Sequence, residues 1–82
     1  MNEISDKKIV EYEKSKNHYV VITESALMKN PETLLWEDCV IYMSYKNINS
    51  SGEYEEVPEN EKKIFVREKK DFMSKFSLCL DI

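Results

Sequence analysis

Short runs of β-branched and aromatic residues, separated by polar spacers of hairpin length, restrict the fold of this chain more than any other feature. The run at residues 39–45, Cys-Val-Ile-Tyr-Met-Ser-Tyr, is the strongest, and weaker runs follow at 53–57, 63–67 and 75–80. Such runs favour strands, and short polar spacers favour antiparallel pairing of consecutive strands. The sequence therefore predicts an antiparallel sheet.

The N-terminal half adds one strand and two helices to this expectation. Residues 19–23, Tyr-Val-Val-Ile-Thr, are a fifth strand-like run. Asn30 as N-cap, followed directly by Pro and Glu, predicts a short helix over residues 31–37. Apolar residues at helical spacing predict another helix over residues 2–16. We therefore expect an α+β domain with a five-stranded antiparallel sheet and two helices packed against it.

Length and charge limit the class of protein. With 82 residues the chain is expected to form a single domain over residues 1–82. It has no apolar run long enough to span a membrane and no signal-peptide pattern, which predicts a cytoplasmic protein without membrane contact. Residues 1–61 hold 13 acids and 6 bases, whereas residues 62–82 hold 3 acids and 6 bases. An acidic body argues against direct binding of nucleic acid and suits a protein that competes with nucleic acid for a basic groove.

The two cysteines and the single histidine are the soft metal ligands that the chain offers. Cys39 and Cys79 lie in apolar, strand-like runs, so we expect two buried thiols in a reducing compartment. They lack the spacing of a metal site, and His18 is expected in a loop without a chemical role. We therefore predict neither a metal nor a cofactor.

Catalytic patterns are equally sparse. The chain has one glycine, hence no glycine-rich phosphate loop, and its one histidine has no nucleophile at a usable spacing. The sequence predicts a protein that is not an enzyme.

The segment that joins the fifth strand-like run to the short helix resembles a known family. Residues 24–28, Glu-Ser-Ala-Leu-Met, followed by the Pro-Glu helix start, are similar to the segment that marks the uracil-DNA glycosylase inhibitors encoded by bacteriophages. Residues 4–6, Ile-Ser-Asp, resemble the opening of that family's first helix, and the two ends of residues 38–45 resemble its second strand. Chain length and expected element order also resemble the family.

This resemblance implies inhibition by DNA mimicry. Uracil-DNA glycosylase holds DNA in a basic groove and inserts an apolar side chain into the base stack as it flips the uracil out. A strand edge of the inhibitor would lie along that groove with carboxylates in place of phosphates. An apolar pocket between the sheet and the second helix would receive the inserted side chain. The implied complex is 1:1, in the cytoplasm of a bacterial host, with an inhibitor that is monomeric when free.

The resemblance also implies which residues contact the groove. Glu24 and Ser25 would bind there, and Thr23 stands where the family has a glutamine. Glu32 would be the helix carboxylate, with Thr33 in its place if the segment is aligned with a gap.

The pocket residues come partly from the resemblance and partly from the expected faces. Met28 matches a pocket-lining methionine of the family, whereas Leu34, Met43 and Val66 are candidates by the face that each is expected to occupy. The predicted partner-binding residues are Thr23, Glu24, Ser25, Ala26, Leu27, Met28, Glu32, Leu34, Met43 and Val66.

Two other non-enzymatic functions use the same composition. The chain could be an acidic DNA-mimic antagonist of another DNA-binding or phage-defence protein, with the glutamates at positions 53, 55, 56, 59 and 61 as its binding surface. It could also be an adaptor whose sheet edge pairs with a partner.

Overall fold

Strand pairing organises the part of the chain that the structure describes. The computed structural model describes residues 8–81. In chain order the elements are β1 (Lys8–Tyr12), β2 (His18–Lys29), β3 (Trp36–Ile48), β4 (Tyr54–Glu56), the 3-10 turn η2 (Glu59–Glu61), β5 (Ile64–Glu68), α1 (Lys69–Lys75) and β6 (Phe76–Asp81). The strands form one sheet in the order β4-β3-β2-β1-β6, and β5 pairs with β3 as well. All pairings are antiparallel, which confirms the α+β class and the single antiparallel sheet.

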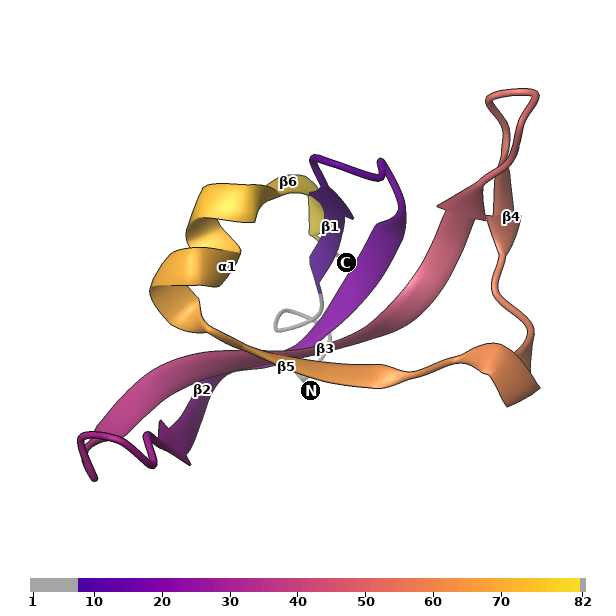
Figure 1. The fold of residues 1–82 in the computed structure, drawn as a ribbon. Coiled ribbons are helices and arrows are strands. Elements are labelled where there is room, and N and C mark those ends of the chain that lie inside the picture. The colour runs from indigo at the N-terminus through magenta and orange to yellow at the C-terminus, as the bar shows by residue number, and fades with distance from the viewer. Residues whose placement is uncertain (1–7, 82) are drawn as a thin grey trace.

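The sheet curls, and α1 connects its two sides. α1 follows β5, which pairs with β3, and leads without a loop into β6, which pairs with β1 at the other side of the sheet. In Figure 1 the strands β6, β1, β2, β3 and β5 surround the core, and α1 covers its open side. The buried residues of this core come from both strands and helix: Val10, Val21, Val40, Tyr42, Phe72 and Phe76.

Aromatic rings supply most of the core volume. The rings of Phe72 and Phe76 are stacked with their centroids 4.2 Å apart, and Tyr42 contacts them at 5.2 and 5.1 Å. The Arg67 guanidinium lies over the Phe76 ring at 5.5 Å, and its Nε donates a hydrogen bond of 3.1 Å to the Tyr42 hydroxyl. Arg67 also pairs with Asp71 of α1 at 2.6 Å, so one side chain links β5, the rings and the helix.

The helix expected over residues 2–16 is wrong wherever the structure describes it. Residues 2–7 lie outside the described residues, and residues 8–12 are β1. Val10 faces Tyr19 of β2 on one side and Leu78 of β6 on the other. Two neighbouring strands therefore decide the conformation of this β-branched segment, against its helical apolar spacing.

The helix expected over residues 31–37 is also wrong, although its start signal is real. The Asn30 side-chain oxygen accepts hydrogen bonds from the backbone N–H groups of Glu32 and Thr33, at 2.8 and 3.4 Å. The turn then ends at Leu34, whose φ of 64° lies in the left-handed region. The Asn30 N–H donates to the Leu35 carbonyl at 2.8 Å, which closes a hairpin loop. An N-cap stabilises a helix only if several helical turns can follow it. Here that is not possible, because Trp36 already belongs to β3.

The remaining strands agree with their expected positions. The runs at 19–23 and 39–45 lie within β2 and β3, and those at 53–57, 63–67 and 75–80 overlap β4, β5 and β6. Over residues 8–81 the sheet has six strands rather than five, since β1 was expected as a helix. The polar spacer between the runs at 63–67 and 75–80 includes the start of α1, because Phe72 packs into the core and Asp71 pairs with Lys75 one turn later.

Candidate functional site

The β2–β3 hairpin extends beyond the other strands that the structure describes. Among residues 8–81, β1 pairs only with residues 18–21 of β2, and β5 pairs with β3 only from Cys39 onward. Residues 26–38 therefore form a projecting hairpin, seen at the lower left of Figure 1. It exposes five large apolar side chains: Leu27, Met28, Leu34, Leu35 and Trp36.

Pairing within the projecting hairpin assigns its side chains to two faces. Leu27 lies opposite Asp38, and Trp36 lies opposite Lys29. Met28 lies opposite Glu37, one residue out of phase with those pairs. Side chains alternate along a strand, so Leu27 and Trp36 share one face and Met28 occupies the other.

Trp36 lies at the base of the hairpin loop and not in the core. Its side chain is 63% exposed. The Glu37 carboxylate accepts a hydrogen bond of 3.1 Å from the Asn30 side-chain amide, which connects the start of strand β3 to the loop. The tip of the hairpin is thus ordered by its own polar contacts while its large apolar side chains face solvent.

Thr23, Glu24 and Ser25 lie inside β2 and not at its end. The pairing register with β3 shifts between Thr23 and Ala26, and the Ser25 N–H donates to the Thr23 hydroxyl at 3.1 Å. Ser25 is exposed. The Glu24 carboxylate pairs with the Lys8 ammonium at 2.8 Å and lines a small cavity of about 100 Å³ beside Phe72. The irregular register turns Glu24 toward β1 and α1, so its carboxylate is not directed straight outward.

The predicted apolar residues do not gather in one pocket. Leu34 lies in the hairpin loop, and Met28 lies on the strand before it. Met43 lies opposite Ile64, and Val66 lies opposite Ile41, on the sheet face turned away from Tyr42. Met43 lines a hollow of about 460 Å³ that Met28, Leu34 and Val66 do not line. Because no helix forms over residues 31–37, the expected pocket between sheet and second helix is absent from the described residues.

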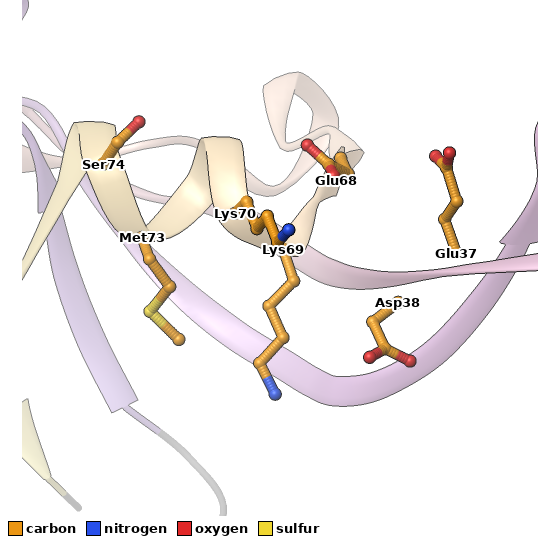
Figure 2. A pocket seen from close by; sticks show the side chains of 7 residues that line it. All are labelled: Glu37, Asp38, Glu68, Lys69, Lys70, Met73 and Ser74. Carbon is orange, nitrogen blue, oxygen red and sulfur yellow. The ribbon is translucent and has the colours of Figure 1, made fainter.

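A shallow groove of about 860 Å³ separates the projecting hairpin from α1. Glu37 and Asp38 line one side, and Lys69 and Met73 belong to the other (Figure 2). Figure 2 shows the long Lys69 side chain reaching out beside Met73, with the two acids across the groove. The groove thus presents charges of both signs together with one apolar side chain, Met73.

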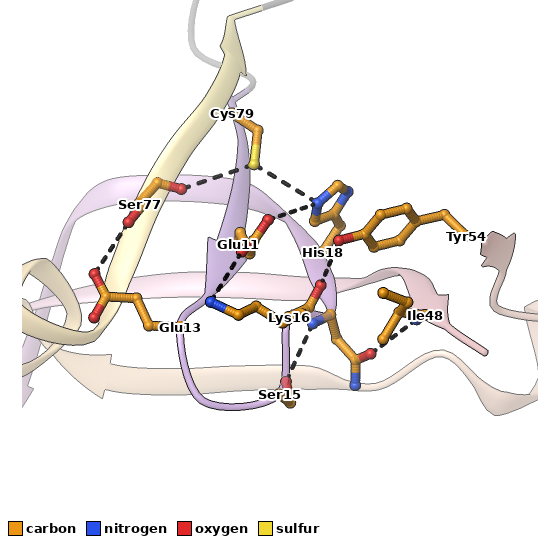
Figure 3. A network of polar contacts seen from close by, with 10 residues as sticks. Glu11, Glu13, Ser15, Lys16, His18, Ile48, Tyr54, Ser77 and Cys79 are labelled. Carbon is orange, nitrogen blue, oxygen red and sulfur yellow. Dashed lines mark hydrogen bonds and ion pairs between the residues drawn. The ribbon is translucent and has the colours of Figure 1, made fainter. Parts of the chain in front are cut away.

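A polar cluster lies at the opposite end of β2, where sequence reasoning expected nothing. His18 begins β2 and is not in a loop. Its Nε2 lies 3.3 Å from a Glu11 carboxylate oxygen and 3.7 Å from the Cys79 sulfur (Figure 3). Burial, and then the Glu11 carboxylate, raises the pKa of the Cys79 thiol. Both thiols are free, but only Cys39 is buried as expected, and Cys79 is exposed.

Strand pairing brings this cluster together from distant positions. Glu11 of β1 lies opposite His18 of β2, and also opposite Ser77 of β6, two residues before Cys79. No local sequence spacing predicts such a cluster. Only a correct assignment of β1 as the strand between β2 and β6 could have found it.

Comparison of the chain with protein-family models, with curated proteins and with solved structures gave no match. Among residues 8–81, no helix has the length and apolar character that a membrane crossing requires.

Proposed function

We propose that this chain inhibits uracil-DNA glycosylase by occupying the DNA-binding groove of the enzyme, as a 1:1 complex in the cytoplasm of a bacterial host. The observation that carries the proposal is the projecting hairpin, residues 26–38, which exposes large apolar side chains beside carboxylates. The sequence resemblance of residues 24–28 selects the target.

The apolar half of the interface would come from the tip of the hairpin. Leu27 and Trp36 share a face and are 60% and 63% exposed. Grouped exposed apolar side chains mark binding surfaces, and tryptophan is among the residues most enriched in interface hot spots. A glycosylase that inserts an apolar side chain into DNA offers a matching apolar contact. The hairpin itself then replaces the pocket that the resemblance implied.

The acidic half would come from carboxylates on the same hairpin. Residues 26–38 contain Glu32, Glu37 and Asp38 but only one base, Lys29. Glu32 and Asp38 are exposed. Carboxylates that meet lysine or arginine in a desolvated groove form charge-assisted hydrogen bonds, and complementary charge speeds encounter. Glu24 would join them by exchanging its Lys8 partner for a base of the enzyme.

The direct test is release of uracil from DNA by a purified bacterial uracil-DNA glycosylase. We expect near-stoichiometric amounts of the protein to stop the reaction, and a competing excess of DNA to slow the onset of inhibition. Full activity at a large molar excess of the protein would reject the proposed target.

A matched pair of leucines tests the proposed surface. Leu27 and Leu78 are 60% and 59% exposed, and both lie on strands. Leu27→Ala should weaken inhibition by at least about fivefold, as loss of a contact worth more than about 1 kcal/mol requires. Leu78→Ala should leave the inhibition constant unchanged. Equal effects of the two substitutions would move the interface away from the hairpin.

The second candidate is an acidic antagonist of another DNA-binding or phage-defence protein. The glutamates at positions 53, 55, 56, 59 and 61 are all exposed, on β4, η2 and the loops around them. Glu56 and Glu59 share Lys62 at 3.7 and 3.3 Å, which holds two of these carboxylates together. A chain that leaves the glycosylase active, yet displaces another protein from DNA until these glutamates are changed to glutamine, would favour this function.

A further inference from the structure

The polar cluster of β1, β2 and β6 has the composition of a metal site. We infer that Glu11, His18 and Cys79 bind a divalent metal ion, with Zn²⁺ as the ion that fits best. The three side chains offer one carboxylate oxygen, one imidazole nitrogen and one sulfur, and these atoms lie within 4.8 Å of one another. This ligand set is independent of the projecting hairpin and of the proposed inhibition.

The separations between the ligand atoms agree with a tetrahedral ion. Zinc–ligand bonds of the usual lengths place a nitrogen and an oxygen roughly 3.4 Å apart, and a nitrogen and a sulfur roughly 3.6 Å apart. The corresponding distances here are 3.3 Å, from His18 Nε2 to the Glu11 carboxylate, and 3.7 Å, from His18 Nε2 to the Cys79 sulfur. Two edges of the tetrahedron are therefore already close to their bound lengths.

The supporting structure holds the ligands on regular elements. Glu11 and His18 are directly opposite one another on paired strands, and Cys79 lies on the strand that flanks β1 on its other side. The Tyr54 ring stacks on the His18 imidazole with centroids 4.1 Å apart, and the Tyr54 hydroxyl donates to the Lys16 carbonyl at 2.9 Å. This packing restricts the rotation of the imidazole before any ion arrives, as a tight site requires.

The ligand chemistry selects among metals. Sulfur and nitrogen ligands favour Zn²⁺ over Mg²⁺ or Ca²⁺, which prefer oxygen. Three protein ligands leave one of four zinc positions for water. On binding, the Cys79 thiol loses its proton to solvent, and the Glu11 carboxylate exchanges its contacts with His18 and Lys16, the latter at 3.8 Å, for the metal.

The test uses the full chain, purified without a histidine tag and treated with a chelator. Titration with Co²⁺ should yield one bound ion per chain, with the thiolate-to-cobalt charge-transfer absorption that a cysteine ligand produces. Zn²⁺ should displace the Co²⁺ and raise the melting temperature, because a ligand that binds only the folded state stabilises it. Mg²⁺ should do neither.

Substitutions identify the ligands. Cys79→Ser should abolish the charge-transfer absorption and weaken Zn²⁺ binding by more than about 100-fold, since even outer-shell changes cost about 10- to 100-fold. Glu11→Gln should also weaken Zn²⁺ binding, although it preserves the shape of the side chain. Cys39→Ala and Glu13→Gln are the controls, because they change the other thiol and a neighbouring acid of Glu11, and both variants should bind as the unmodified chain does.

Two results would overturn the inference: no Co²⁺ binding by the unmodified chain, or charge-transfer absorption that survives Cys79→Ser. Circular dichroism of each metal-free variant establishes whether it is folded. Cys79 is exposed, so its serine variant is expected to fold and can decide the matter even if another variant does not.

Discussion

The aromatic core and the projecting hairpin use large apolar side chains in opposite ways. Under α1, the rings of Tyr42, Phe72 and Phe76 contact one another at 4.2–5.2 Å and are almost fully buried. On the hairpin, Leu27 and Trp36 are mostly exposed. The largest side chain of the chain, Trp36, thus contributes little to the core. A small domain gives up considerable burial in this way, which is understandable if the hairpin acts in binding.

The difference lies in what covers each face. The curled sheet and α1 enclose the rings from several sides, whereas within residues 8–81 the segments 26–29 and 36–38 pair only with each other. A two-stranded hairpin cannot enclose side chains on either of its faces. Substitutions in the two regions should therefore act on different quantities, namely the free energy of unfolding and the affinity for a partner.

The largest effect is expected at Phe72. Phe72→Ala removes a ring that is 4% exposed and stacked on Phe76, and should lower the free energy of unfolding by about 3–5 kcal/mol. Urea unfolding followed by circular dichroism measures the change. Met73→Ala, at the next residue of α1, is the control, because Met73 is 53% exposed and its truncation should cost under about 1 kcal/mol. Equal losses would mean that α1 does not complete the core.

The second-largest effect is expected at Trp36, and it concerns only the affinity for the partner. Trp36→Ala should weaken glycosylase inhibition by about 2–4 kcal/mol of binding free energy, as truncation of a hot-spot tryptophan does. Its free energy of unfolding should change by no more than about 0.5 kcal/mol, because the side chain is mostly exposed. If the variant were markedly less stable yet inhibited fully, Trp36 would contribute to the fold as the core residues do and not to binding.

The smallest effect is a pH dependence at the edge of the core. Lys75, and then Arg67, holds the pKa of Asp71 below its ordinary value of 3.8. A depressed folded-state pKa stabilises the fold above the unfolded value, and this contribution is lost as the pH falls through the folded pKa. Asp71→Asn should therefore lower the melting temperature at neutral pH, and the difference from the unmodified chain should vanish once the pH is well below the folded-state pKa of Asp71. If the difference in melting temperature persisted in strong acid, the effect of Asp71→Asn would come from packing and not from charge.

The strands were largely predictable because their signal is local. The apolar run at residues 39–45 needed no information beyond its own residues, and it lies within β3. β1 was not predictable in this way, since its conformation depends on β2 and β6, which pair with it. α1 was not predicted, because the four charged residues Glu68 to Asp71 resemble a polar spacer between two strands. The helix is stabilised by the burial of Phe72, which a local pattern does not show, and by the Asp71–Lys75 ion pair.

The candidate sites divide along the same line. Leu27, Met28 and Glu32 were proposed from one continuous stretch and lie on the projecting hairpin, as does Leu34, which was chosen by its expected face. Met43 and Val66 were chosen by an expected face, and without the second helix they share no pocket with Met28. The cluster of Glu11, His18 and Cys79 was missed entirely, because the nearest two ligands are brought together by strand register and the third by the last strand.

The pairing of β1 with β6 also sets the order in which the molecule can assemble during synthesis. Lys8 lies opposite Asp81. The edge of β1 that pairs with β6 therefore has no partner until β6, the last described strand, has been synthesised. At ribosomal rates of about 5–20 residues per second, that delay lasts several seconds. A β-hairpin forms within about 1–10 μs once both of its strands are available. The β2–β3 hairpin can thus be in place on the nascent chain well before the last strand emerges to complete the sheet.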